Sequence, residues 1–138
     1  MMYKKSAGFT LIELLVVMAI LALLAGLVGP TVMEQLSGAK TKTAKVQIED
    51  LGGALDLYRL DVGRYPTSSE GLEALVKKSD SKKWNGPYLK KSKVPEDPWG
   101  NAYHYRSPGD HGDYDLYSLG ADNTEGGEGE SSDVTSWD

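Results

Sequence analysis

Apolar side chains run almost unbroken from Phe9 to Met33, and Glu13 is the one ionisable residue among them. As a helix with a rise of about 1.5 Å per residue, this run is long enough to cross a bilayer core of roughly 30 Å. Two lysines lie shortly before it, and positive charges on this side favour a cytoplasmic N-terminus. The pattern therefore predicts a membrane-spanning helix over residues 9–30.

Beyond Pro30 the apolar positions change to a spacing of three and four residues, which is typical of one face of a helix in solution. These positions are Ala44, Ile48, Leu51, Leu55, Tyr58 and Val62. We expect a helix over residues 31–62 that continues the membrane helix, with Gly63 as its C-cap. Because proline lacks a backbone donor and two glycines lie close before it, the continuous helix should be weakest near Pro30.

The rest of the chain is expected to cover the apolar face of this helix. Residues 102–106 and 114–119 are rich in aromatic side chains, and the turn residues between them predict an antiparallel hairpin. Thr67 and Glu70 have the spacing of a capping box, which predicts a short helix over residues 72–76. The expected fold class is therefore α+β, with one long N-terminal helix packed on a small C-terminal antiparallel sheet.

Composition adds two constraints. None of the 138 residues is cysteine, so the chain has no disulfide framework and no thiolate chemistry. The net charge is −5 but uneven, because residues 77–93 hold seven lysines against one acid and residues 107–138 hold nine acids without Lys or Arg. These two segments suggest complementary contacts between like subunits, although two solvated faces would have the same composition.

No catalytic constellation is evident in the sequence. The pattern Ser-x-x-Lys occurs twice, from Ser37 and from Ser79, and both matches are ascribed to chance because the other β-lactamase motifs are absent. His104 and His111 lack an evident set of further metal ligands, and no phosphate-binding loop is present. The negative net charge and the membrane helix also disfavour binding to nucleic acid. We therefore expect no enzyme and no nucleic-acid partner.

Glu13 needs a separate explanation. A carboxylate near the start of a membrane helix costs a few kcal/mol on insertion scales and is usually functional. It either reaches back to the membrane interface without a further role, or it pairs with a cation inside the membrane. The α-amino group of a neighbouring copy would serve, if the chain were cut just before the apolar run. A secretory signal peptide is the rival interpretation, but the apolar run is too long and no correctly spaced small-x-small site follows it.

Residues 120–133 form an acidic, glycine-rich segment without a basic residue. Calcium takes oxygens from carboxylates, backbone carbonyls and water, and glycines let carbonyls converge on it. An EF-hand fits poorly, because Thr124 and Gly126 occupy positions where ligands are expected and no second helix follows. The segment is therefore either a calcium-binding loop or a disordered acidic loop.

The residues Gly8-Phe9-Thr10-Leu11-Ile12-Glu13 resemble the processing site of type IV prepilins and pseudopilins. The resemblance implies that a prepilin peptidase removes residues 1–8 as a leader by cutting between Gly8 and Phe9, and methylates the new amine of Phe9. It also implies that Glu13 pairs with the Phe9 amine of an adjacent subunit during filament assembly.

Later motifs are similar to those of the major pseudopilin of type II secretion. They are Arg64-Tyr65-Pro66-Thr67, Gly71-Leu72-Glu73-Ala74-Leu75, Asp97-Pro98-Trp99-Gly100 and Leu116-Tyr117-Ser118-Leu119-Gly120-Ala121-Asp122. This resemblance implies a structural subunit of the periplasmic pseudopilus that drives export of folded proteins. It also implies one calcium, held by the Leu119 carbonyl, Asp122 and Asp133, with Ser131 and Ser132 as further candidates.

The same resemblance implies a topology and a set of partners. The chain is expected in the bacterial inner membrane as a single-pass protein with a cytoplasmic N-terminus and a periplasmic domain over residues 31–138. Its partners would be further copies of itself, minor pseudopilins, the inner-membrane assembly platform and the prepilin peptidase. Two alternatives stay open: a subunit of a surface type IV pilus, and a membrane-tethered calcium-binding module that does not polymerise.

Overall fold

The structure, a computed structural model, describes residues 8–138. It contains the long helix α1 (Leu11–Val62), the 3-10 helices η1 (Leu72–Leu75) and η2 (Gly129–Ser131), and three short strands. The chain divides after Leu36 into two units, which are described separately below. Most of the predicted leader, residues 1–7, lies outside the described residues.

The first unit carries the apolar part of α1. Every residue from 8 to 36 is exposed, including large side chains such as Leu11, Leu23 and Leu27. Among the described residues, α1 is the one helix long and apolar enough to cross a membrane, with a mean hydropathy of 2.9 in its most apolar window. Pro30 lies inside the helix, which continues on both sides of it as expected.

The second unit, Ser37–Asp138, is built on the amphipathic part of α1. The helix buries one face there, through Ala44, Ile48, Leu51, Ala54, Leu55 and Tyr58. Five of these are positions that the sequence pattern predicted, while Val62, the last of the predicted stripe, is only partly buried. Leu75 and Leu116, both fully buried, are among the side chains that complete the core.

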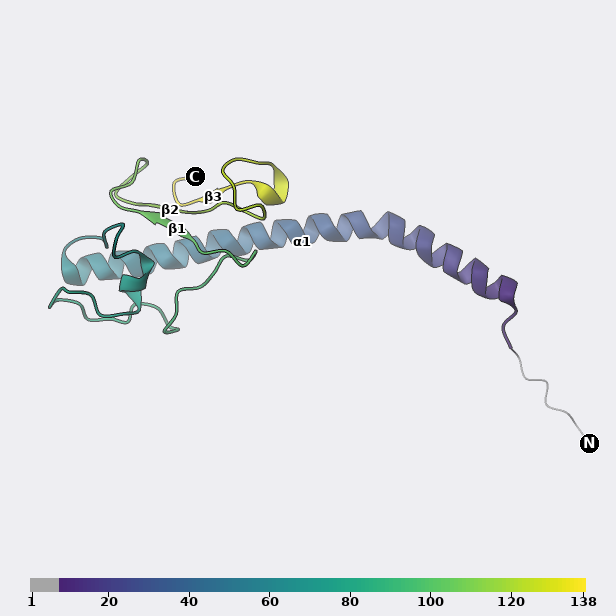
Figure 1. Ribbon diagram of the computed structural model, residues 1–138, viewed down its shortest axis with the longest axis horizontal. Coiled ribbons are helices and arrows are strands. Elements are labelled where there is room, and N and C mark those ends of the chain that lie inside the picture. The colour runs from purple at the N-terminus through teal and green to yellow at the C-terminus, as the bar shows by residue number, and fades with distance from the viewer. Residues whose placement is uncertain (1–7) are drawn as a thin grey trace, which may run out of the picture. The chain divides into compact units, whose positions relative to one another are not determined.

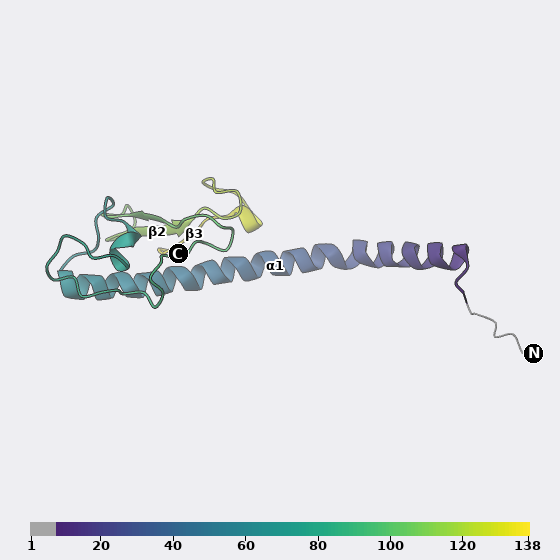
Figure 2. The same ribbon diagram turned by 60° about the horizontal axis from the view of Figure 1, so that its bottom comes forward.

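A small antiparallel sheet lies along this part of α1 (Figures 1 and 2). Its strands are β1 (His104–Arg106), β2 (Asp115–Ser118) and β3 (Val134–Thr135), in the order β1-β2-β3. Tyr105 pairs with Leu116, and Tyr117 pairs with Thr135. The predicted hairpin is thus confirmed in shorter form, and β3 is an additional strand that the sequence did not reveal.

The short helix predicted after Thr67 needs correction. Thr67 and Glu70 do exchange the hydrogen bonds of a capping box, at 3.1 and 3.2 Å, but they close a turn. The helix after them is the single 3-10 turn η1, which begins beyond Gly71 and ends before Val76. Gly52 lets the sheet approach α1 closely, because a Cβ atom there would lie 3.0 Å from the Tyr114 hydroxyl oxygen.

Candidate functional site

The predicted cleavage position lies in open chain just before α1. Phe9 is 85 % exposed, and a Cβ atom on Gly8 would have no described heavy atom within 4 Å other than those of its chain neighbours. The helix begins two residues later, at Leu11. The Gly8–Phe9 bond therefore lies outside the helix, so cleavage at this predicted position would not require α1 to unwind.

Glu13 forms a capping box with Thr10, a contact that the sequence analysis missed. The Glu13 amide donates to the Thr10 hydroxyl at 3.2 Å, and the Thr10 amide donates to the Glu13 carboxylate at 3.4 Å. This is the reciprocal pattern of Thr-x-x-Glu at a helix N-terminus, and it satisfies two amide groups that the helix leaves unpaired. Glu13 thus has a capping role inside its own chain, besides any role between chains.

The start of the acidic loop, which comprises residues 119–133, is held by the buried carboxylate of Asp97. Asp97 is 4 % exposed, and its oxygens accept hydrogen bonds from the Ser118 hydroxyl at 2.7 Å and from the Asn101 amide at 2.8 Å. Ser118 Oγ in turn accepts from the Gly120 amide at 3.2 Å. The Asp97–Asn101 turn therefore fixes the end of β2 and the first residues of the acidic loop.

The acidic loop has two limbs, a first limb that begins at residues 119–122 and a second limb that ends at residues 130–133. The two limbs meet at Gly120. The Ala121 amide donates to the Glu130 carbonyl at 3.0 Å. A Cβ atom on Gly120 would come within 2.8 Å of the carbonyl oxygens of both Glu130 and Ser132, and the φ of Gly120 is +79°. Only glycine tolerates both conditions. Backbone carbonyls from one limb therefore gather against the other limb, next to Leu119.

Asp133 has a carboxylate oxygen that fits a cation. Its Oδ2 accepts from the Gly126 amide at 3.2 Å, while its Oδ1 is buried and has no hydrogen-bond partner among the described residues. A buried carboxylate oxygen without a donor is unfavourable unless something else compensates it. Calcium, a hard cation that prefers oxygen ligands, would do so.

The other candidate ligands are arranged less tightly. Asp122 is exposed, and its Oδ1 accepts from the Thr124 amide at 3.2 Å. Ser131 and Ser132 are half-buried, and the Ser132 hydroxyl donates to the Gly129 carbonyl at 2.7 Å. Within residues 8–138, no three His, Asp or Glu side chains gather as a metal-binding group. A cation here would therefore rely on backbone carbonyls and water besides two carboxylates.

An aromatic contact holds the exit of the acidic loop. Trp137 stacks on His111 with ring centroids 3.9 Å apart and meets Tyr117 of β2 edge-on at 5.8 Å. The His111 ring also lies 3.2 Å from Asp115. Burial alone would raise the pKa of Asp115, but the amides of residues 110 and 111 and the His111 ring lower it overall. Both histidines thus belong to the packing of the sheet, since His104 stacks on Tyr117.

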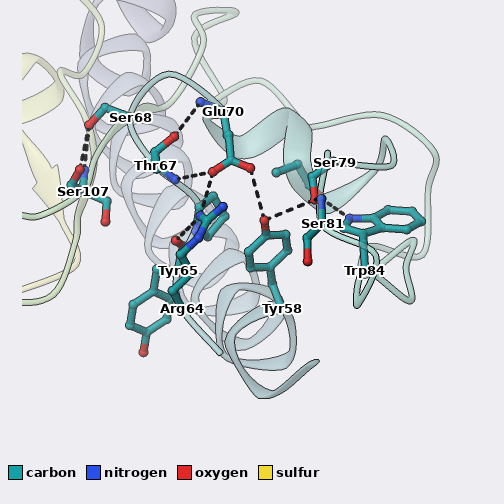
Figure 3. Close-up of polar contacts among 12 residues, drawn as sticks. Tyr58, Arg64, Tyr65, Thr67, Ser68, Glu70, Ser79, Ser81, Trp84 and Ser107 are labelled. Carbon is teal, nitrogen blue, oxygen red and sulfur yellow. Dashed lines mark hydrogen bonds and ion pairs between the residues drawn. The ribbon is translucent and has the colours of Figure 1, made fainter. Parts of the chain in front are cut away.

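The turn after α1 holds a second polar cluster (Figure 3). Glu70 lies 2.7 Å from the Arg64 guanidinium and 3.3 Å from the Tyr58 hydroxyl, and it accepts the Thr67 amide. The Arg64 hydrogen bond is the main cause that lowers the Glu70 pKa to about 2. The sequence Arg64-Tyr65-Pro66-Thr67 therefore closes the end of α1 with an ion pair.

The basic segment, residues 77–93, leaves most of its charge unneutralised. In the part of the chain that the structure describes, Lys77 is the one lysine of this segment in an ion pair, 3.8 Å from Glu73. A groove of about 850 Å³ lies between Leu57 on α1 and residues 88–96, with Lys90, Lys91 and Lys93 in its lining. The predicted contact between this segment and the acidic tail of another copy stays a prediction.

Comparison with known families gives two matches that together span nearly the whole chain. Residues 31–137 match the family described as type II secretion system (T2SS), protein G. Residues 3–29 match the prokaryotic N-terminal methylation motif.

Individual relatives agree with these matches. The chain is 50 % identical over 143 residues to type II secretion system core protein G of Pseudomonas aeruginosa, covering 100 % of this chain and 99 % of the relative. It is 45 % identical to core protein G of Vibrio cholerae, with 97 % and 93 % covered. The fold is similar to the crystal structure of the major pseudopilin of enterohaemorrhagic Escherichia coli, with a TM-score of 0.63, 33 % identity, and 76 % and 88 % covered.

Proposed function

This chain belongs to the protein G family of the type II secretion system and is a subunit of the pseudopilus, and on that premise we propose how it is processed, assembled and stabilised. A pseudopilin assembles with further copies of itself and with other components of the secretion system, as a filament anchored in the inner membrane. The family consists of structural subunits. We propose that this member carries no catalytic activity of its own, and that it drives export of folded proteins through the growth of the filament.

One observation carries the filament role most directly. Residues 8–36 are exposed throughout although most are apolar, so lipid or neighbouring copies must cover them. Deleting the gene in the native host should stop release of secreted proteins and leave no defect in surface fibres. A long surface fibre made of this chain would favour the pilus alternative, and a stable monomer after correct processing would favour the non-polymerising one.

The processing step that we propose is a cut between Gly8 and Phe9 by the prepilin peptidase, followed by methylation of the Phe9 amine. Support comes from the match of residues 3–29 to the methylation motif and from the open backbone at Gly8. The cut leaves the apolar run in the mature chain, so the membrane anchor is retained. The N-terminus would face the cytoplasm and residues 31–138 the periplasm.

For assembly, we propose that the Glu13 carboxylate of one subunit pairs with the Phe9 amine of the next. A carboxylate in the membrane is stabilised by an opposite charge, and removing one partner leaves the other uncompensated. The capping box with Thr10 places the carboxylate at the helix N-terminus, where a second donor could approach it. The minor pseudopilins and the inner-membrane assembly platform would be the further partners.

For the metal, we propose one calcium in the acidic loop, held by the Leu119 carbonyl, Asp122 and Asp133, with Ser131 and Ser132 as further candidates. The buried Asp133 Oδ1 without a donor and the carbonyls that gather beside Gly120 support the proposal. The cation would offset repulsion among the loop's acids and tie its two limbs together. A calorimetric calcium titration of the full chain in detergent micelles tests it, and the absence of binding heat at millimolar calcium would refute it.

A further inference from the structure

Glu130 is unlike the other acids of the acidic loop. Among the described residues, it is the one acidic side chain between Asp122 and Asp133 that reaches a hydrogen-bond or ion-pair partner outside the loop. Its carboxylate accepts from the Trp99 indole at 3.0 Å and lies 3.8 Å from the Lys40 ammonium of α1. The Asp122 and Asp133 carboxylates, in contrast, contact only amides within the loop. Glu130 thus anchors the acidic loop to the rest of the unit.

The backbone of Glu130 strengthens this anchor. Its carbonyl accepts from the Ala121 amide, so the residue also joins the second limb of the acidic loop to the first. It lies in the middle of η2, directly before the candidate ligands at 131–133. Figure 2 shows this part of the chain, in yellow, beside α1. One residue therefore connects both limbs, the Asp97–Asn101 turn and the long helix.

We propose that Glu130 is a positioning residue for the calcium site, an inference that rests on the calcium site proposed above. Its Oε1 accepts from Trp99 and faces Lys40, so we assign the carboxylate an anchoring role and do not count it among the ligands. It holds the two limbs at the spacing that the cation requires, so less loop entropy is lost on binding. Outer contacts of this kind typically change metal affinity by about 10–100-fold when removed.

The proposal says that Glu130 promotes calcium binding by anchoring the loop and not by its negative charge. Three substitutions distinguish these two effects. Glu130→Ala removes the anchor together with one negative charge. Trp99→Phe removes the indole donor and leaves every charge of the acidic loop in place. Glu128→Ala is the matched control, because it removes the same charge two residues earlier in the chain. The Glu128 side chain is exposed and makes no hydrogen bond or ion pair with the described residues.

The measurement is the calcium dissociation constant of the full chain in detergent micelles at about 0.15 M salt, where long-range charge effects are screened. Glu130→Ala and Trp99→Phe should each weaken binding about tenfold. Glu128→Ala should weaken it about twofold at most, by the same screening. Glu130→Gln should recover most of the affinity, because its amide oxygen still accepts from Trp99 and the exposed Lys40 pair contributes little.

A second readout follows the indole itself. Calcium should shift the Trp99 indole proton resonance in the unsubstituted chain and in Glu130→Gln, but not in Glu130→Ala, because binding and anchoring are reciprocally linked. Equal weakening by Glu128→Ala and Glu130→Ala would overturn the proposal, as would normal affinity in Trp99→Phe. If the unsubstituted chain binds no calcium, the calcium site has failed; if it binds and the variants do not differ, only the role of Glu130 has failed.

Discussion

The Ser118 hydroxyl donates a 2.7 Å hydrogen bond to the buried carboxylate of Asp97, across 21 residues of sequence. The same carboxylate accepts the Trp99 and Asn101 amides, at 3.1 and 2.8 Å. Ser118 is the last residue of β2 and is fully buried. These hydrogen bonds therefore fix the start of the acidic loop. They also explain the structural role of the motif Asp97-Pro98-Trp99-Gly100.

Replacing Asp97 tests whether its hydrogen bonds stabilise the fold. Asp97→Ala leaves the buried Ser118 hydroxyl and two part-buried amides without their acceptor. A fully buried group left unpaired costs about 1–3 kcal/mol, and the two amides cost less because water can reach them. We expect the free energy of unfolding to fall by roughly 2–4 kcal/mol. Asp97→Asn, which keeps an acceptor for both amides, should lose less than half of that. Denaturant unfolding of the full chain in detergent micelles measures both, and equal loss in the two variants would contradict the arrangement.

Glu70 predicts a specific acid sensitivity. Its pKa in the folded chain is about 2, below the ordinary 4.5, chiefly because Arg64 donates to it. A lowered pKa stabilises the fold fully above the ordinary value, and this stabilisation is lost as the pH falls from about 4.5 towards 2. Since the side chain is 24 % exposed, we expect the loss to be about 1–2 kcal/mol.

The check on Glu70 is a comparison of melting temperatures at pH 6 and pH 3. Glu70→Gln should melt lower at pH 6 and show a smaller further drop between the two pH values than the unsubstituted chain. Glu73→Gln is the control, because its pair with Lys77 is exposed and 3.8 Å long. If Glu70→Gln and Glu73→Gln have the same pH dependence, the ion pair with Arg64 does not stabilise the fold.

Calcium should stabilise the unit that contains the acidic loop. A ligand that binds only the folded state at a hundredfold excess over its dissociation constant adds about 2.7 kcal/mol. Calcium should therefore raise the melting temperature of the full chain in detergent, and a chelator should reverse the rise. Magnesium should substitute poorly, because it requires a tighter octahedral shell.

Two substitutions in the acidic loop test whether the calcium response depends on the proposed ligands and not on the loop's total charge. Asp122→Ala should abolish the calcium response and leave the helix content largely intact, because α1 does not depend on the loop. Glu125→Ala, which removes an exposed charge from the same loop, should keep the response. Identical melting curves with calcium and with chelator in the unsubstituted chain would reject the site.

Glu13 allows its two roles to be separated. Glu13→Gln keeps an oxygen that can accept from the Thr10 amide but removes the charge, whereas Glu13→Ala removes both. If Glu13 pairs with the Phe9 amine of a neighbour, both variants should be inserted and processed, and both should assemble into filaments poorly. The yield of sheared filaments against membrane-bound subunit measures this. Normal assembly of Glu13→Gln would show that the cap with Thr10 suffices and that no ion pair is needed.

The helix and most of its buried face could be predicted because their signal is local and repeats. The spacing from Ala44 to Tyr58 survives in the structure, and α1 adds only Ala54 to the predicted buried positions. The two strands of the hairpin had a comparable signal in their aromatic side chains. β3 has only two residues, Val134 and Thr135, and follows a long loop, so no periodicity could reveal it.

The polar contacts were harder to predict because they join distant residues. Nothing in the sequence places Ser118 beside Asp97, or Glu130 beside Trp99, 31 residues away. The capping box at Thr10 is different, since the spacing Thr-x-x-Glu is a local signal that does predict these hydrogen bonds. The cleavage position, the pairing of Glu13 and the calcium ligands remain predictions that only experiments on the protein can test.

The N-terminal mass of the mature protein tests the account most directly, because processing, anchoring and assembly all depend on the same cut. Protein isolated from membranes of the native host should begin at Phe9, and its terminal peptide should carry one methyl group on the amine. A variant with Gly8 replaced by a bulkier residue should instead retain the full leader. An intact Met1 or Met2 in the unsubstituted chain, or cleavage near Ala25, would contradict the account.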